Sequence, residues 1–588
     1  MKSGRATYRA WLRRLGSLGA AGLLALTTWA AVPPPSQDRP IELPPMIVAE
    51  VSKAAPWLHA SVDGTEYLSR CSVATTHAFA TSQWRIHALL REFLPGEFLA
   101  KDEAPTTSIL MPLSLKSASD DAVREEMLRR EEDDVRRKAE VARRKGELAI
   151  SARLMFLPNQ RLDDRDTGAV FTYVDESNFD ADRMVVATDY VYTRLARRQP
   201  TLPQWFIEGM TGLHAQASFR VDPITLPAFT WISAEETAAL VRDAEMRRVF
   251  VPMSDMFAPD ALIGAANTHP LRGAVWRSQV RLFIRWAIDP SNAPFRENLW
   301  TLVRRACEEP QTEAMFIECF GFGYSDLRDR LSDYLALAVK SPIRITPRKL
   351  PAGPRVEVRT ATPLQIARLR GEWERLEIAF VRERHPQFVD RYVEQARNTL
   401  QRAVGSGLRD PQLLASLGLC EIEAGNPTAA QPWLEAAADA DVVRPRVYFE
   451  IARQRWQALT RGTAETRLFS VAELEPVLAP LRRATRQAPL LPETMMLLQD
   501  AWLRSQDTSL PPDMPFLIDA ARQFRRYPAI GFKLALLHAR HGQTMEALDV
   551  LNVAGQFVTD RELRARYRSL YEHLASKQEQ RVQEKTVR

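Results

Sequence analysis

Two predicted helices within residues 180–216 carry side chains whose types and spacing could form a catalytic or metal-binding site. Thr188 and Tyr192 are four residues apart, so they share one face of the first helix, with Asp189 beside them. Glu208 lies on the second helix. Positions 188 and 192 have the i, i+4 spacing by which two ligands on one helix face can bind zinc. Two carboxylates on facing helices can also divide acid and base roles.

The residue types at these positions argue against a zinc enzyme. A catalytic zinc needs three protein ligands, and neither Thr188 nor Tyr192 binds zinc at neutral pH. The sequence has no histidine between His87 and His214. His214 follows Glu208 by six residues, about 240° around the helix, so it does not replace a missing ligand on that face. We therefore expect no metal, no cofactor and no catalytic residues.

Residues 203–209 read PQWFIEG, which is similar to the P-x-W-[FL]-x-E-G segment of gluzincin metallopeptidases of the peptidase-MA-like group. The resemblance covers residues 51–342 and implies an α+β, zincin-like fold. Its register puts Thr188-Asp189-Tyr190-Val191-Tyr192 where the family has H-E-x-x-H, and Glu208 at the third zinc ligand. Asp189 replaces the general-base glutamate and is one methylene shorter. The resemblance thus implies an inactive homologue whose cleft can still accept a peptide as an added strand.

Three other functions stay open. The chain could be a hydrolase that uses Asp189 and Glu208 as paired carboxylates, a residual metallopeptidase, or a purely structural envelope component. Hydrolysis that is lost on Asp189→Asn would favour the paired-carboxylate hydrolase, and stoichiometric zinc would favour the residual metallopeptidase. A C-terminal region that captures no partner would favour the structural component.

The C-terminal part, residues 364–588, is predicted to be all helical with Ala- and Leu-rich faces. Two segments repeat one spacing: Leu417, Gly425, Ala430, Leu434 and Ala437; and Leu534, Gly542, Ala547, Leu551 and Ala554. A weaker copy contains Val477, Leu481, Ala484 and Pro489. The pattern resembles the tetratricopeptide repeat, which stacks helical hairpins into a surface that commonly binds peptides or proteins. We therefore expect a protein or peptide partner for these repeats.

Composition shifts predict the remaining organisation. We expect a signal peptide at residues 1–31 and a Pro-rich linker at residues 32–50. The degenerate peptidase-like domain follows at residues 51–342, with a charged helical insert at 118–148. A second Pro-rich linker at residues 343–363 leads to the repeats at residues 364–588. Short β-branched or aromatic runs predict strands at residues 66–68, 108–111, 152–157 and 169–174, and periodicity predicts a helix over 75–94.

The N-terminus predicts export to the periplasm or the extracellular space. Positive residues precede an apolar stretch and small residues, which is the pattern of a secretory signal; an uncleaved segment would anchor the chain in a membrane. Cys307 and Cys319 could pair after export, although four cysteines in 588 residues are more typical of buried thiols. The net charge of +6, from 79 basic and 73 acidic residues, is too small and too dispersed to predict nucleic-acid binding.

Overall fold

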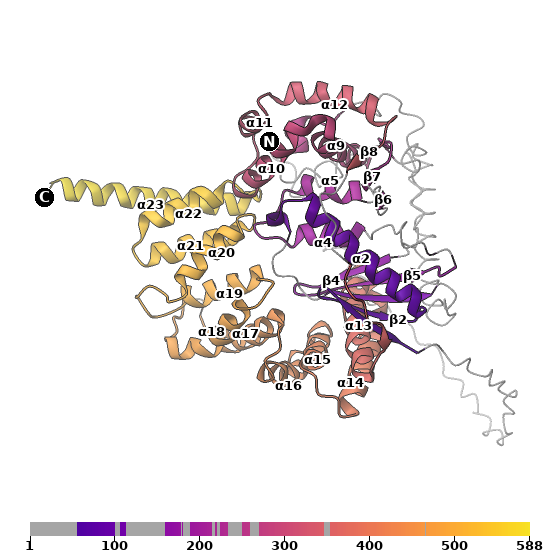
Figure 1. The fold of residues 1–588 in the computed structure, drawn as a ribbon. Coiled ribbons are helices and arrows are strands. Elements are labelled where there is room, and N and C mark those ends of the chain that lie inside the picture. Colours follow the sequence, from indigo (N-terminus) through magenta and orange to yellow (C-terminus); the bar gives the residue numbers. More distant parts are fainter. Residues whose placement is uncertain are drawn as a thin grey trace, which may run out of the picture. The chain divides into compact units, whose positions relative to one another are not determined.

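The computed structural model describes residues 56–99, 106–112, 159–177, 179, 188–214, 218–219, 224–232, 250–258, 270–345, 353–464 and 466–587. Within them, a mixed-sheet region is followed by a long all-helical region, which confirms the predicted α+β and all-α layout (Figure 1). The predicted signal peptide and first linker, the insert 118–148 and the strand 152–157 lie outside the described residues.

The main sheet has six strands in the order β4-β5-β3-β2-β1-β9. They are β1 (Leu58–Val62), β2 (Thr65–Ser69), β3 (Thr106–Pro112), β4 (Asn159–Asp163), β5 (Gly168–Val174) and β9 (Arg359–Thr360). β2, β3 and β5 run parallel, whereas β1, β4 and β9 are antiparallel to the strands they pair with. Asp63 and Gly64, with φ of 50° and 76°, form the two-residue turn that Asp-Gly favours between β1 and β2. The predicted strands at 66–68, 108–111 and 169–174 are confirmed.

One helix packs on each face of this sheet. Tyr67 and Leu68 point to opposite faces, as neighbours in a strand must. The Tyr67 face packs on α2 (Val73–Phe93), the predicted helix over 75–94 that links β2 to β3. The Leu68 face packs on α13 (Pro363–Arg384), where Trp373 lies 5.4 Å from Phe171 between ring centroids.

A helical subregion follows the sheet and encloses one large apolar cluster. It contains α4 (Thr188–Ala196), α5 (Gln204–His214), α7 (Met253–Met256), α9 (Pro270–Ile288), α10 (Ala293–Glu308), α11 (Glu313–Phe320) and α12 (Tyr324–Ala338). A small antiparallel sheet, β6 (Ser218–Phe219), β7 (Ile224–Leu226) and β8 (Ile343–Ile345), lies in the same subregion. None of the helices in the described part of the chain is both long enough and apolar enough to span a bilayer.

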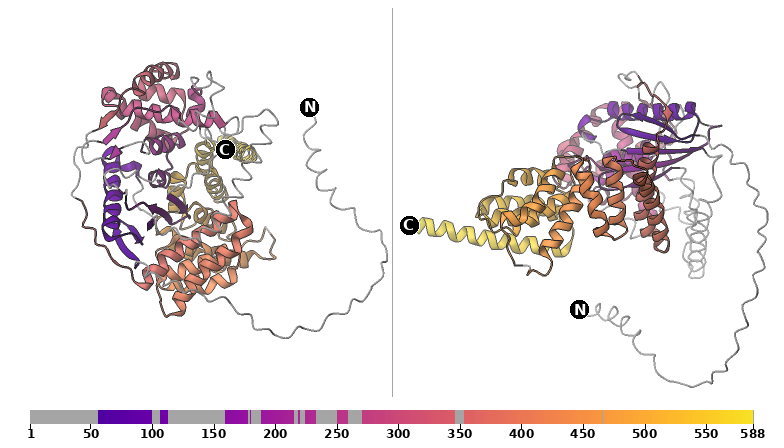
Figure 2. Two further views of the ribbon diagram at one scale, coloured as in Figure 1. Left: turned by 90° about the vertical axis from the view of Figure 1, so that its right-hand side faces the viewer. Right: turned by 90° about the horizontal axis from the view of Figure 1, so that it is seen from below.

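The C-terminal helices are stacked side by side in chain order (Figure 2). They are α13, α14 (Val389–Gly405), α15 (Pro411–Glu423), α16 (Pro427–Asp439), α17 (Pro445–Thr460), α18 (Val471–Thr485), α19 (Pro492–Leu503), α20 (Met514–Gln523), α21 (Pro528–Arg540), α22 (Thr544–Gly555) and α23 (Arg561–Val587). We call this set the helical array. Many of these helices begin with proline, whose fixed φ and missing N–H suit the first helical turn.

The small residues of the repeat pattern lie where it requires them. Gly425 and Gly542 both have φ of +77° and form the turns after α15 and α21. Gly418 faces Leu434 so closely that an added Cβ would lie 2.7 Å from the leucine Cδ2. Gly531 approaches Ala554 in the same way, at 2.4 Å from its Cβ. Helical hairpins can press together in this way only where one partner lacks a side chain.

Two short strands lie within the segment for which the sequence predicts a Pro-rich linker, residues 343–363. β8 pairs with β7, and β9 pairs with β1 at the edge of the main sheet. The capping box of Thr362 and Gln365 then starts α13. The first helix of the array therefore follows directly from the edge of the sheet against which it packs.

Candidate functional site

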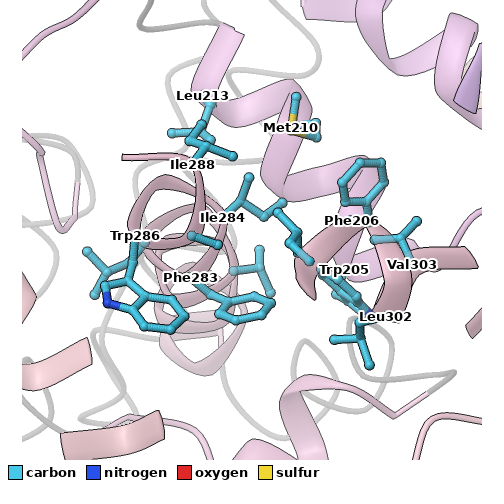
Figure 3. Packing of buried hydrophobic residues seen from close by; sticks show 14 of the residues in the cluster. Trp205, Phe206, Met210, Leu213, Phe283, Ile284, Trp286, Ile288, Leu302 and Val303 are labelled. Carbon is cyan, nitrogen blue, oxygen red and sulfur yellow. The ribbon is translucent and has the colours of Figure 1, made fainter. Parts of the chain in front are cut away.

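The α4–α5 hairpin contains the positions that sequence reasoning selected. Val191 and Leu195 of α4 pack in the same buried cluster as α5. On α5, Trp205, Phe206, Met210 and other apolar side chains of the second predicted helix are buried against α9 and α10 (Figure 3). The indole Nε1 of Trp205 donates a hydrogen bond to Gln311 Oε1 at 2.9 Å. The aromatic residues of the PQWFIEG segment thus anchor α5 in the core.

The glycine of that segment also has a packing role. A Cβ on Gly209 would lie 2.5 Å from Ile284 Cδ1 and 3.1 Å from the carbonyl oxygen of Val280, both on α9. Only glycine lets α5 and α9 cross at this distance. Because packing requires this glycine, its presence is not evidence of chemistry.

Glu208 lies on α5 and is half-buried. Its Oε1 accepts a hydrogen bond from Gln204 Nε2 at 3.0 Å. Burial raises the pKa of Glu208, and the hydrogen bond from Gln204 and the charge of Arg277 oppose this only in part. A carboxyl with a raised pKa is better suited to give up or take a proton near neutral pH than an exposed one.

The other three positions that the sequence selected lie on α4. Thr188 and Asp189 are its first two residues, but their side chains lie outside the part that the structure describes. Tyr192 is 37% exposed, which places its side chain at the surface of the hairpin. The pairing of Asp189 with Glu208 therefore stays a prediction.

Histidines from other segments are engaged elsewhere. His59 hydrogen-bonds to Glu66 at 3.1 Å and to Gln365 at 3.2 Å on the main sheet. His87 contacts Asp63 through Nδ1 at 2.9 Å and Arg194 through Nε2 at 2.5 Å.

His214, on α5 itself, is hydrogen-bonded within its own helix. Its Nδ1 lies 2.8 Å from the Met210 carbonyl oxygen. Burial lowers its pKa to about 4, against the opposing effect of that hydrogen bond. Within the described ranges, no group of three or more His, Cys, Asp or Glu side chains could hold a metal ion.

The cysteines fall within the described residues, and all four are free thiols. Cys307 is buried, and its Sγ lies 3.1 Å from Arg198 Nη1. Burial raises its pKa despite the nearby Arg198 and Arg526. Cys307 and Cys319 therefore do not form the disulfide that the sequence left open.

Sequence reasoning missed a buried ionic cluster between the main sheet and the helical array. We call it the arginine pocket: Arg375 of α13, Arg444 and Arg446 at the start of α17, and the carboxylates Glu372 and Glu423. Glu372 bridges two of the arginines, with Oε1 2.7 Å from Nη2 of both Arg375 and Arg444. Burial raises the pKa of Glu372, but the two guanidinium groups hold it well below its usual value.

The turn between β4 and β5 inserts two aspartates into this pocket. Asp164 Oδ2 lies 2.7 Å from Arg375 Nη2 and also pairs with Arg446. Asp166 Oδ2 accepts the backbone N–H of Arg446 at 2.9 Å, and its Oδ1 lies 3.4 Å from Arg444 Nε. Burial raises the pKa of Asp164, yet the positive charges of Arg375, Arg446 and Arg444 hold it far below its ordinary value. Spacing gives no sign of this cluster, since its partners lie far apart in the sequence.

A groove of about 230 Å³ lies near the C-terminal end of the array, between α20, α21 and α22. Its lining is mainly apolar: Ile518, Ala521, Phe524, Tyr527, Gly531, Leu534, Val550, Val553 and Ala554. Arg522, Arg525 and Asp549 complete the lining. Tyr527 and Val553 are 42% and 44% exposed, so large apolar surface there faces solvent. We call it the α20–α22 groove.

A cavity of about 440 Å³ lies beside α9 and α12. Its polar lining groups are partly paired within the protein. The hydroxyl of Tyr334 donates to Asp289 Oδ2 at 2.7 Å, and the guanidinium of Arg330 lies 4.4 Å from the centroid of the Phe322 ring.

Comparison with known proteins identifies no relative. No family model matches the chain, and neither a curated protein nor a solved structure matches it.

Proposed function

We propose that this chain is an exported, non-catalytic, peptidase-like protein that binds a peptide or a segment of a protein through tetratricopeptide-like helical repeats. The observation that carries the proposal is the α20–α22 groove. It combines exposed apolar side chains with a concave surface, as peptide-binding sites on helical scaffolds do. The packing roles of Trp205 and Gly209 support a PQWFIEG segment kept for folding rather than for catalysis.

The lining of the groove defines the ligand that we propose. Tyr527, Val550 and Val553 would receive one or two large apolar side chains, each worth about 1.5–3 kcal/mol when fully buried. Arg522 and Arg525 outnumber Asp549 among the charged lining residues. The ligand should therefore carry an acidic residue next to its apolar anchor.

Selection of a displayed random peptide library on the purified full chain tests this function. We expect enrichment of peptides with a Leu, Phe or Ile anchor beside Asp or Glu. Val553→Asp should weaken binding of a selected peptide at least tenfold, because it places a charge in the groove. Val443→Asp is the matched control, since Val443 is 64% exposed and does not line the groove. Equal binding by both variants, or no enrichment, would contradict the proposal and favour a purely structural envelope component.

The alternative function is hydrolysis by Asp189 and Glu208 as paired carboxylates. The raised pKa of Glu208 favours it, because an acid catalyst must hold its proton near neutral pH. Peptide and glycoside substrates should then be cleaved by the wild-type chain and not by Asp189→Asn or Glu208→Gln. Stoichiometric zinc with chelator-sensitive cleavage would instead indicate a residual metallopeptidase.

A further inference from the structure

The arginine pocket holds the β4–β5 turn as a protein holds a ligand. Asp166 caps α17, the helix whose own N-cap residue, Arg444, makes no side-chain capping bond. A carboxylate that accepts an N–H at a helix start is favoured by the helix dipole as well as by the hydrogen bond. Asp166 is supplied by a distant part of the chain, so the helical array contains an anion site that its own sequence leaves unfilled.

The charges around the pocket balance only when the turn is present. Within the array, five guanidinium groups pair with three carboxylates: Arg375, Arg382, Arg444, Arg446 and Arg453 with Glu372, Glu423 and Glu450. Asp164 and Asp166 supply the two missing negative charges. Without the turn, this cluster would carry two uncompensated positive charges, and the three arginines of the pocket, Arg375, Arg444 and Arg446, are buried. Such a site attracts anions strongly because buried charge needs a partner.

The pocket also has hydrogen-bonding capacity to spare. Nε of Arg446 is buried and makes no hydrogen bond, and the nearest carboxylate oxygen paired with it, Glu450 Oε1, is 3.9 Å away. The turn satisfies the remaining donors through side-chain oxygens of two aspartates spaced i, i+2. A short acidic segment with the same spacing presents the same groups.

We propose that the arginine pocket is a carboxylate-binding site of the helical array, that the β4–β5 turn is its intramolecular ligand, and that an Asp-x-Asp segment of another protein competes with the turn for it. The turn thus keeps the site closed, and a partner gains access only when the turn withdraws. This site shares no residue with the α20–α22 groove, so the proposal does not depend on the function proposed above.

A peptide copied from the turn tests the competition. The fluorescein-labelled peptide RLDDRDTG, residues 161–168, is titrated with the full chain and followed by fluorescence anisotropy. The isosteric double variant Asp164→Asn/Asp166→Asn should bind it at least tenfold more tightly than the wild type. Adding Arg444→Gln should abolish that gain, and the control peptide RLDNRNTG should not bind. Equal affinity of wild type and double variant, or binding that survives Arg444→Gln, overturns the proposal.

If the double variant does not fold, hydrogen exchange of the wild-type chain tests the same competition. The wild-type chain is incubated with each peptide in large excess, and exchange of the β4 and β5 amides is measured. The Asp peptide should accelerate exchange at least twofold relative to the Asn peptide, because it displaces the turn. Equal exchange with both peptides overturns the proposal.

Discussion

His214 shows how a residue that suggests chemistry can be explained by burial. It follows the Glu-Gly pair closely in sequence, yet it is 6% exposed and bonded to the Met210 carbonyl oxygen. Its low pKa means that the folded protein holds it neutral at physiological pH. Glu208, in contrast, is half-buried and has a raised pKa, so it remains a candidate for proton transfer.

The burial of His214 predicts an acid-sensitive stability. The unfolded chain takes up the histidine proton near pH 6.5, whereas the folded chain does so only near pH 4. Stability is therefore complete above the unfolded pKa and is lost as pH falls towards 4. The shifted pKa of His214 alone should lower the free energy of unfolding by about 2 kcal/mol between pH 7.5 and pH 5. In urea unfolding, the free energy of unfolding of His214→Gln should therefore fall by about 2 kcal/mol less than that of the wild type between pH 7.5 and 5.

His77→Gln is the matched control, because His77 is exposed on α2. It should keep the pH dependence of the wild type. The same loss of stability with acid in His214→Gln as in the wild type would contradict this account.

At the scale of helices and strands, close crossings are set by single small residues. α5 meets α9 at Gly209, α15 meets α16 at Gly418, and α21 meets α22 at Gly531. In each case the added Cβ would overlap a neighbouring side chain or backbone atom. Gly209 and the array glycines Gly418 and Gly531 therefore serve one physical purpose.

Gly209→Ala should destabilise the protein. The new methyl group would contact the Val280 carbonyl oxygen as well as Ile284, and overpacking of this kind outweighs the better helix propensity of alanine. We expect a net loss of about 1–2 kcal/mol in urea unfolding. Gly405→Ala, in α14, is the control, because its Cβ would meet nothing within 4 Å and should be neutral or stabilising. A Gly209→Ala variant as stable as the control would show that α9 can move aside.

At the scale of the whole molecule, the described residues between 56 and 587 form one compact unit. The sheet contacts the array through the arginine pocket and through α13, whose Leu369, Trp373 and Leu376 face the sheet. Further along, Arg525 and Arg526 donate to the carbonyl oxygens of Glu308 and Ala306 at the end of α10. These contacts tie together parts for which the sequence predicts separate domains.

These contacts predict cooperative unfolding of the sheet region and the array. Hydrogen exchange with mass spectrometry, in increasing urea, should show α5, α9, α13 and α17 losing protection at one urea concentration, because unfolding the sheet exposes the apolar face of α13. The triple substitution of Asp164, Asp166 and Trp373 by alanine should separate the transitions. Loss of protection in α17 well before α9 in the wild type would instead indicate independent domains.

The sequence by itself determined the local features of this protein. Helix periodicity located α2 and α5, and small residues located the hairpins of the array. The two helices expected within residues 180–216 are present as α4 and α5 and pack in one apolar cluster, whereas the register that resembles H-E-x-x-H stays a prediction. Each of these signals acts over a few residues, where chain geometry alone decides which side chains are neighbours.

Only the tertiary structure decided which distant residues meet. Asp164 and Arg375 are 211 residues apart, and Asp166 and Arg446 are 280 residues apart, so no periodicity could pair them. The same holds for Gly209, whose need to be glycine comes from α9, and for α13, which reads as a repeat helix but covers a sheet face. A buried ion pair is fixed by long-range packing, since desolvated charges are stable only where the fold brings both partners together.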